Sequence, residues 1–460
     1  MKSILCIIIL MFLSGCNLSQ EIGKNTVLRE VRVLGESPIF LETEEAKTEE
    51  TIETAPIEQI PEEEEFGEEE EDVVEYEEEF NEFGDDTISE ETEVANQEEF
   101  KEPYANLKKT TDEFTDELKA EMMRAQQNLY GYSNLEITQQ NLYVEILFAL
   151  ENYIEEMEVS SKDTAEIDKV FQYVLIDHPE IFYADGYSFI KYTVGEELQK
   201  ITFKGTYVYD WEEKEILQAE IQTAALELLK NLPSTATDYE KVKYVYETII
   251  NQTEYSLEAK DNQNICSVFL RQASVCQGYA KAVQYLLEML QIPTTLVMGT
   301  VETGEAHAWN MVKINNNHYF VDATWGDASY RELSQKENES KSTTTINYDY
   351  LCVTTKDISR THSVGDILPV PICDSMEANY YVLEGAYFTQ VDYEKVRLLI
   401  EKYREEGRES VTLKCADEKV YKELSYGLLQ EQKIFQYLES KNNSIVYTDS
   451  EKQRSLTFWL

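Results

Sequence analysis

Apolar residues recur at helical spacing in some stretches of the chain and at strand spacing in others. Residues 139–157 carry an apolar stripe with the helical period, and a second helical pattern over 210–232 stops near Pro233. Between them, residues 187–209 alternate in the manner of strands. These patterns predict an N-terminal domain of helices and strands over residues 105–235.

The next stretch, residues 236–365, combines an amphipathic helix with a hairpin. Ser274 is the expected N-cap of a helix over 275–290. The alternating residues 306–314, a run of three asparagines and a short return run at 318–323 predict two antiparallel strands joined by a tight turn. We therefore expect a helix that packs against an antiparallel sheet.

The last stretch, residues 366–460, predicts a small α+β accessory domain. Its expected strands are 379–382, 409–414 and an edge strand at 455–460, and its expected helix is 391–405. Its residues form no cluster that we can connect to chemistry.

The first sixteen residues, 1–16, have the pattern of an export signal. Met1-Lys2 precedes an apolar run over 4–13, which is shorter than the ~20 residues that a helix needs to cross a bilayer. The run ends in Leu-Ser-Gly-Cys at Cys16, which resembles the lipobox of bacterial lipoproteins. The resemblance implies lipid attachment at Cys16 and a place at the cell membrane, outside the cytoplasm. An ordinary export signal with a chance cysteine is the alternative.

Charge separates the following segment from the rest of the chain. Residues 41–100 hold 28 Asp or Glu and one Lys, which accounts for more than half of the net charge of −50. Such a sequence cannot bury enough apolar surface to offset the entropy of ordering, so residues 17–104 are expected to form a disordered acidic tether. An acidic tail that serves only solubility is the alternative. The remaining chain has no stripe rich in Lys and Arg, which argues against a nucleic-acid partner.

Three residues of the central stretch carry the candidate chemistry. Cys276, His307 and Asp322 follow one another at intervals of 31 and 15 residues, and the chain has only four histidines. A thiol nucleophile, an imidazole base and a carboxylate that orients the base form the set needed for acyl transfer. Cys276 falls in the first turn of its predicted helix, where free amide groups and the helix dipole favour the thiolate.

The hairpin provides a geometric test of this assignment. An even number of residues in the turn places His307 and Asp322 on one face of the sheet, whereas an odd number separates them. A catalytic role for both residues therefore predicts an even number of residues in the turn. Trp309 or Trp325 would then shield the pair from water.

The segments V-C-Q-G-Y-A, H-A-W-N and V-D-A-T-W-G-D resemble the transglutaminase-like family, which has a papain-type fold. The resemblance covers residues 236–365 and implies an α+β core in which the helix with the cysteine packs on an antiparallel sheet. It also implies that Cys276 is the nucleophile, His307 the general base and acid, and Asp322 the hydrogen-bond partner of the imidazole. The segments D-H-P-E-I-F-Y and N-Y-D-Y-L-C-V-T-T resemble bacterial surface proteins that carry this domain.

Two glutamines near the cysteine bear on what the resemblance implies. Gln277 stands where the animal crosslinking enzymes have tryptophan, and the sequence shows no calcium loop and no metal-ligand spacing. We therefore expect no cofactor and no metal. An oxyanion hole needs the amide of Cys276 and one further donor, for which Gln272 is the candidate. Gln272 and Gln277, with the two tryptophans, are the expected supporting residues of the site.

The other histidines and one further aspartate are expected to be structural. His178 precedes a proline, His318 lies near the hairpin end, and His362 lies in a loop before the last domain. Asp327 competes with Asp322 as the orienting acid, but it follows a glycine in a loop.

The sequence leaves two functions open. The first is a membrane-tethered extracellular thiol enzyme, either a transglutaminase-like acyltransferase or a protease or amidase, that acts on extracellular protein or cell-wall peptide. The second is an inactive transglutaminase-like module for binding or adhesion at the cell surface. The three residues do not decide between water and an amine as acyl acceptor, because that choice depends on the shape of the groove and on water exclusion.

Overall fold

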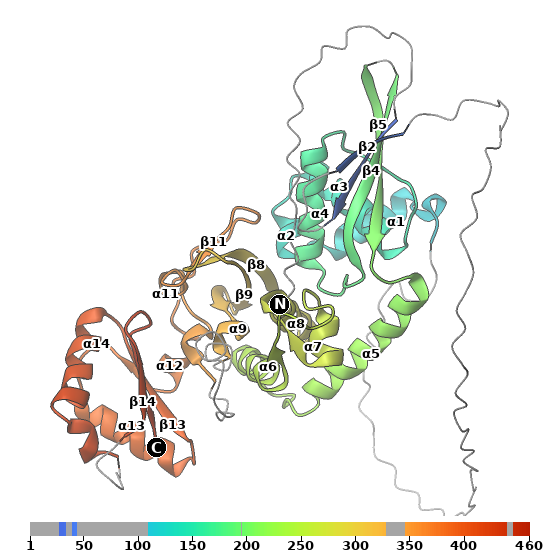
Figure 1. Ribbon diagram of the computed structural model, residues 1–460. Coiled ribbons are helices and arrows are strands. Elements are labelled where there is room, and N and C mark those ends of the chain that lie inside the picture. The colour runs from blue at the N-terminus through green and yellow to red at the C-terminus, as the bar shows by residue number, and fades with distance from the viewer. Residues whose placement is uncertain (1–26, 34–38, 44–108, 195, 328–345, 439–444) are drawn as a thin grey trace, which may run out of the picture. The chain divides into compact units, whose positions relative to one another are not determined.

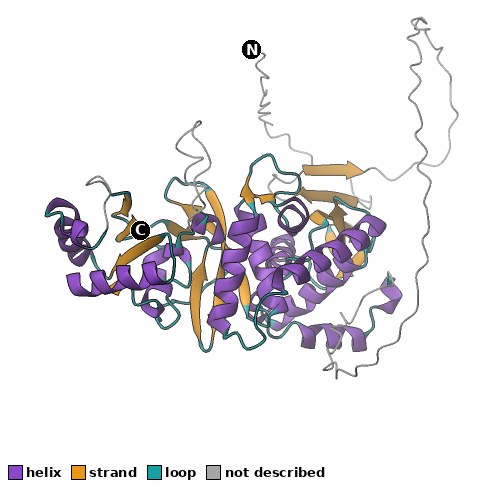
Figure 2. Cartoon of the chain, turned by 90° about the horizontal axis from the view of Figure 1, so that it is seen from below, coloured by secondary structure: helices purple, strands orange, loops and turns teal. Residues whose placement is uncertain are grey.

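The computed structural model describes residues 27–33, 39–43, 109–194, 196–327, 346–438 and 445–460. Helices and strands are mixed along these residues (Figures 1 and 2), which confirms the predicted α+β class. The predicted signal peptide 1–16, with its cysteine Cys16, lies outside the described residues. In the described part of the chain, no helix has both the length and the apolar composition needed to span a bilayer.

The N-terminal region consists of helices and a sheet that contains a long antiparallel hairpin. Its helices are α1 (Asp116–Ala125), α2 (Tyr130–Ser133), α3 (Ile137–Glu151), α4 (Thr164–Asp177) and α5 (Trp211–Leu229). Its strands β3 (Met157–Val159), β4 (Ala184–Val194) and β5 (Glu197–Tyr207) belong to a sheet in the order β2-β1-β4-β5-β3. Helix α3 is buried continuously from Leu142 to Leu150, because its apolar residues cover every side rather than one stripe.

Two short strands of this sheet depart from the expected disorder of residues 17–104. Strand β1 (Val27–Val33) pairs antiparallel with β4, and β2 (Ile39–Thr43) pairs with β1. For these residues the prediction of disorder is wrong. The acidic composition behind that prediction begins only near residue 41, whereas Val27–Val33 is rich in residues that favour strands. The rest of the segment lies outside the described residues.

The central region places a helix on a four-stranded sheet. Its helices are α6 (Asp238–Gln252), α7 (Ile265–Arg271), α8 (Cys276–Met289), α9 (Ala323–Gly326) and α11 (Thr355–Ile358), with a 3-10 turn η2 (Tyr348–Tyr350). The strands β8 (Thr294–Val301), β9 (Ala306–Ile314), β10 (Asn317–Val321) and β11 (His362–Val364) form an antiparallel sheet in the order β10-β9-β8-β11. The two-residue strands β6 (Glu254–Tyr255) and β7 (Ala273–Ser274) pair in parallel and form a separate sheet. Helix α8 packs against β8 and β9 (Figure 1).

The C-terminal region is also α+β, although two predicted details are wrong. It contains α12 (Tyr380–Leu383), α13 (Tyr393–Glu405), α14 (Glu418–Ser425), the turns η3 (Tyr426–Gln430) and η4 (Lys433–Gln436), and the strands β12 (Tyr387–Phe388), β13 (Ser410–Cys415), β14 (Tyr447–Ser450) and β15 (Ser455–Trp459). Residues 379–382 are not a strand, because the Asn379 side chain accepts the amide of Tyr381 and caps α12. Strand β15 is not an edge strand, because it lies between β13 and β14.

The described residues from 109 onward pack into one compact unit. Hydrogen bonds connect residues on either side of the predicted boundaries at 235/236 and 365/366. The Gln284 side chain on α8 donates to the carbonyl of Ile176, and the Tyr130 hydroxyl donates to the carbonyl of Pro369. The predicted boundaries within this unit stay predictions.

Candidate active site

The candidate nucleophile stands at the start of α8. Cys276 is the first residue of the helix and is partly exposed, whereas Cys266, Cys352, Cys373 and Cys415 are buried free thiols. Burial raises the pKa of each of these four thiols, so they are protonated and unreactive near neutral pH. The structure therefore leaves Cys276 as the accessible thiol among the described cysteines.

The helix begins one residue later than the predicted cap implies. Val275 is the N-cap, and the Ser274 side chain makes no capping bond to α8. Instead, the Ser274 hydroxyl lies 2.6 Å from the Ser267 hydroxyl and donates to the carbonyl of Asn262 at 3.0 Å. These bonds fix the chain immediately before the nucleophile.

Gly278 allows this close packing beneath the first turn. A Cβ atom at this position would lie 2.0 Å from the Ser274 hydroxyl oxygen and 2.9 Å from the carbonyl oxygen of Asn262. The absence of a side chain therefore lets the Ser267–Ser274 pair sit directly against the turn that carries Cys276.

The hairpin turn has the even length that catalysis predicts. Only Asn315 and Asn316 separate β9 from β10, and Met311 pairs with Phe320 in the observed register. Because side chains alternate along a strand, this register places His307 and Asp322 on the same face. The side-chain amide of Asn310 on β9 also donates to the carbonyl of Ala280, which ties this strand to α8 at 2.9 Å.

Asp322 is a buried carboxylate at the end of the hairpin. It caps α9, where one oxygen accepts the amide of Trp325 at 3.0 Å, and its other oxygen accepts Nε2 of His307 at 2.8 Å. Burial alone would raise the pKa of Asp322, but the ion pair and hydrogen bond with His307, and the hydrogen bond from His362, hold that pKa well below its usual range. The carboxylate therefore remains ionised although it is 1% exposed.

His307 interacts with both the carboxylate and the thiol. Burial would lower the pKa of the imidazole, but Asp322 and a hydrogen bond with the Cys276 side chain together raise it to about 10. Since Nε2 faces Asp322, the second ring nitrogen, Nδ1, is left for the thiol. The raised pKa of His307 favours its charged imidazolium form beside the thiol.

Two tryptophans cover the imidazole as predicted from their positions. The rings of Trp309 and Trp325 lie 5.9 Å and 6.2 Å from the ring of His307, centroid to centroid, and both tryptophans are buried. They belong to an apolar cluster that includes Phe320 and Tyr350. The water-poor surroundings strengthen the interactions of the His307–Asp322 pair.

His362 is the residue of this site that sequence reasoning missed. It lies in strand β11 rather than in a loop, and its Nε2 lies 2.9 Å from the same oxygen of Asp322 that His307 contacts. The expectation of a loop histidine with only a structural role is therefore wrong in its placement. Alternation over 362–364 is the only sequence signal, and three residues are too few to identify a strand.

The other sequence candidates fall into different environments. Gln277 follows Cys276 on α8 and is half-buried, whereas Gln272 is an exposed residue in the left-handed conformation at the end of α7. No hydrogen bond of either glutamine side chain with Cys276 is present among the described residues. Asp327 accepts the Tyr279 hydroxyl at 3.1 Å, and His178 contacts Glu180.

His307, Asp322 and His362 also form a donor set that could in principle hold a metal ion. Their ligand atoms lie within 4.8 Å of one another, and two imidazoles with one carboxylate suit zinc or iron. In the structure, however, both imidazoles use their Nε2 atoms in hydrogen bonds to the carboxylate. A metal would have to displace both bonds, so hydrogen bonding accounts for the three side chains without a metal.

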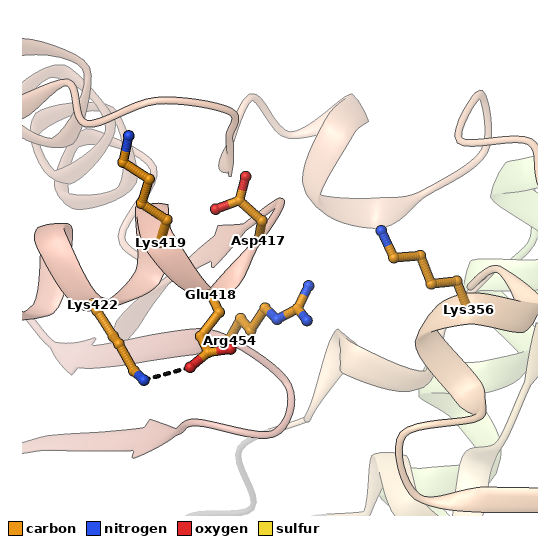
Figure 3. A pocket seen from close by; sticks show the side chains of 6 residues that line it. All are labelled: Lys356, Asp417, Glu418, Lys419, Lys422 and Arg454. Carbon is orange, nitrogen blue, oxygen red and sulfur yellow. Dashed lines mark hydrogen bonds and ion pairs between the residues drawn. The ribbon is translucent and has the colours of Figure 1, made fainter.

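A hollow of 490 Å³ lies between α11 of the central region and residues of the C-terminal region (Figure 3). It is lined by Lys356, Asp417, Glu418, Lys419, Lys422 and Arg454. Lys422 is paired with Glu418, and no residue of the Cys276 site lines the hollow. We connect no chemistry to it.

Comparison with known proteins places the site within a recognised domain. Residues 227–323 match the family model of the transglutaminase-like superfamily. No curated protein matches the chain.

Three solved structures show similarity at low identity. A protein described as a TGase has 15% identity, covers 35% of this chain and 47% of its own, and gives a TM-score of 0.23. A candidate protease from Parabacteroides distasonis has 10% identity, covers 28% of this chain and 35% of its own, and gives a TM-score of 0.19. A candidate cysteine protease from Cytophaga hutchinsonii has 15% identity, covers 43% of this chain and 77% of its own, and gives a TM-score of 0.21. This chain thus spans less than half of the first two proteins.

The family match over residues 227–323, which contain Cys276, His307 and Asp322, identifies this part of the chain as a transglutaminase-like domain.

Proposed function

We propose that the chain is a thiol enzyme that acts on protein or peptide amide bonds through an acyl-enzyme on Cys276. One observation carries the proposal: Nε2 of the His307 ring is hydrogen-bonded to the buried Asp322 carboxylate at 2.8 Å, and the same imidazole interacts with the Cys276 side chain at the start of α8. The accessible thiol at a helix start, the buried carboxylate and the aromatic cover are features that such chemistry requires.

Each proposed residue has a defined role in the reaction. The thiolate sulfur of Cys276 attacks the amide carbonyl carbon, and the backbone amide of Cys276 at the start of α8 donates a hydrogen bond to the developing oxyanion. Collapse of the intermediate breaks the C–N bond, and His307 gives its proton to the leaving amine. A thioester remains on the sulfur. Asp322 keeps the imidazole oriented and stabilises its charged form.

The second half of the reaction defines the class of enzyme. His307 removes a proton from the acceptor, which attacks the thioester and releases the sulfur as thiolate. Water as acceptor yields a carboxylic acid, as in a protease or amidase, and an amine yields a new amide, as in a transglutaminase. The half-buried Gln277 beside the nucleophile gives no preference for either acceptor.

The proposed place of action follows from the N-terminal sequence. We infer lipid attachment at Cys16 and an acidic tether over much of residues 17–104, so that the domain works outside the cytoplasm at the membrane. The substrate would then be an extracellular protein or a cell-wall peptide.

A paired assay separates the two acceptors and tests the proposal. The full-length protein is incubated with casein and dansylcadaverine, and both protein-bound fluorescence and newly released peptides are measured. We expect at least one of the two signals, and a loss of roughly 1,000-fold in Cys276→Ala because the nucleophile is gone. Signals that are equally strong in wild type and Cys276→Ala, or absent from both, would favour the alternative of an inactive binding or adhesion module.

A further inference from the structure

The Asp322 carboxylate has more donors than a three-residue catalytic arrangement needs. Oδ1 of the carboxylate accepts a hydrogen bond from the backbone N–H of Trp325. Oδ2 lies 2.8 Å from Nε2 of His307 and 2.9 Å from Nε2 of His362. We propose that His362 is a positioning residue that holds Asp322 for His307, so that the working constellation has four members rather than three. This inference rests on the proposed function.

The surroundings of His362 fix its ring in one place. Its side chain is fully buried, and the rings of Trp309, Trp325 and Tyr350 surround it at 5.1 Å, 4.8 Å and 5.7 Å between centroids. The ring of His307 lies 5.2 Å away. Because the bonded nitrogen of His362 is directed at Asp322 inside this cage, His362 acts on the reaction through Asp322 and not on the substrate.

The sheet is adapted to bring His362 to this position. Strand β11 pairs with β8, and in this pairing His362 lies opposite Val301 and Val364 lies opposite Gly299. A Cβ atom on Gly299 would lie 2.1 Å from the backbone oxygen of Ser363 and 2.8 Å from the Trp309 ring. Glycine at this position therefore allows β11 and Trp309 to approach each other closely enough to enclose His362.

A second hydrogen bond sets the orientation of the His362 ring. Nδ1 lies 2.8 Å from the Thr361 hydroxyl, which is much closer than the hydroxyl's other contact, the carbonyl of Ile358 at 3.5 Å. A hydroxyl that donates to Nδ1 leaves the hydrogen of the ring on Nε2, where it points to Asp322. Thr361 thereby selects the tautomer that donates to the carboxylate.

This arrangement gives His362 a function that packing alone would not require. His307 gives up a proton in the first half-reaction and regains one in the second, so the strength of its bond to Asp322 changes between the two. His362 takes no part in these transfers, and its Nε2–H keeps its bond to the same oxygen throughout. A carboxylate held in this way stays ionised and directed at His307, which preserves the imidazolium that supports the Cys276 thiolate.

Two substitutions of similar size distinguish the hydrogen bond from the packing. His362→Phe keeps an aromatic ring in the cage but removes the donor, and His362→Gln keeps an N–H at a similar reach. The rate of iodoacetamide alkylation at Cys276 is measured against pH in the full-length protein by peptide mass, with thermal melting as a check of folding. Tyr350→Phe is the matched control, because it alters the same cage without touching Asp322.

We expect His362→Phe to reduce the alkylation rate near pH 6 by roughly 10- to 100-fold and to move the profile toward higher pH, because a bond to a charged group is lost. The alkylation rate of His362→Gln should stay within about threefold of the wild-type rate. The rate of Tyr350→Phe should equal that of the wild type. If His362→Phe does not fold, Thr361→Val carries the test, with the same upward movement of the profile expected. A folded His362→Phe or Thr361→Val protein with the wild-type profile would overturn the inference. Slow labelling of the wild type itself would contradict the proposed function, and the role of His362 with it.

Discussion

The buried charges around Asp322 show at the residue scale how this site is held together. Removing a carboxylate from water is unfavourable unless donors replace the water, and Asp322 has the Trp325 amide and two imidazoles for this purpose. The same ion pair keeps His307 charged through neutral pH. In the proposed reaction, this same pair is what primes Cys276.

The first turn of α8 allows a residue-scale prediction. Gly278→Ala should destabilise the protein by roughly 1–3 kcal/mol, because the new Cβ would meet the Ser274 hydroxyl oxygen at 2.0 Å. Urea denaturation measures the change. Helix propensity alone favours alanine by about 1 kcal/mol, so the sign is informative.

A double variant serves as the control for this clash. Ser274→Ala removes the nearest atom, so Gly278→Ala combined with Ser274→Ala should regain part of the lost stability. A Gly278→Ala protein that is as stable as wild type would show that the turn is not packed as described.

The residues of the site differ in how far the sequence reveals them. Cys276, His307 and Asp322 could be selected because each lies in a short motif with a recognisable role. His362 could not, because its contact with Asp322 joins residues 40 positions apart through the pairing of β11 with β8. The predicted N-cap of α8, Ser274, is also wrong by one residue. The N-cap is Val275, and the Ser274 hydroxyl lies against the Ser267 hydroxyl instead.

At the scale of elements, the hairpin was the most predictable part of the site. Its alternating strands and asparagine turn predict the hairpin itself, whereas the even or odd length of the turn was left open. The observed two-residue turn sets the register that puts His307 and Asp322 on one face. Short elements were less predictable. Asn379 caps a single helical turn in a stretch that suggests a strand, and the polar β14 gave no sign that it covers the outer edge of β15. Strand β1 pairs with β4, which lies more than 140 residues further along the chain, and β2 pairs only with β1.

A buried ion pair connects the C-terminal region with the central region at the scale of the whole molecule. The ammonium of Lys414 on β13 lies 2.8 Å from one oxygen of Asp349, and the Ser455 hydroxyl donates to the other oxygen at 2.7 Å. Both charged side chains are almost completely buried. No sequence pattern indicated this contact, because it depends on how η2 of the central region packs against β13 of the C-terminal region.

Lys414→Met should therefore destabilise the protein by roughly 3–5 kcal/mol, because it leaves the Asp349 carboxylate buried without its counter-ion. The measurement is the free energy of unfolding in urea. Combining Lys414→Met with Asp349→Asn removes the remaining charge and should restore part of that stability. A double variant that is less stable than Lys414→Met alone would contradict this account of the contact.

The central claim is that Cys276 is a nucleophile primed by His307, and the pH dependence of its alkylation tests this claim most directly. Iodoacetamide is applied to the full-length protein and to His307→Ala, and the labelled cysteine is identified by peptide mass. Because Asp322 and Cys276 raise the pKa of His307 to about 10, the imidazolium persists from acidic pH to well above neutrality. An ordinary thiol, in contrast, loses its proton only near ~8.5.

We predict rapid labelling of Cys276 that persists below pH 7 in the wild type and disappears at that pH in His307→Ala, which should label only as an ordinary thiol does. Slow labelling with the ordinary profile in both proteins would contradict the account and favour a binding module that keeps the fold without the chemistry.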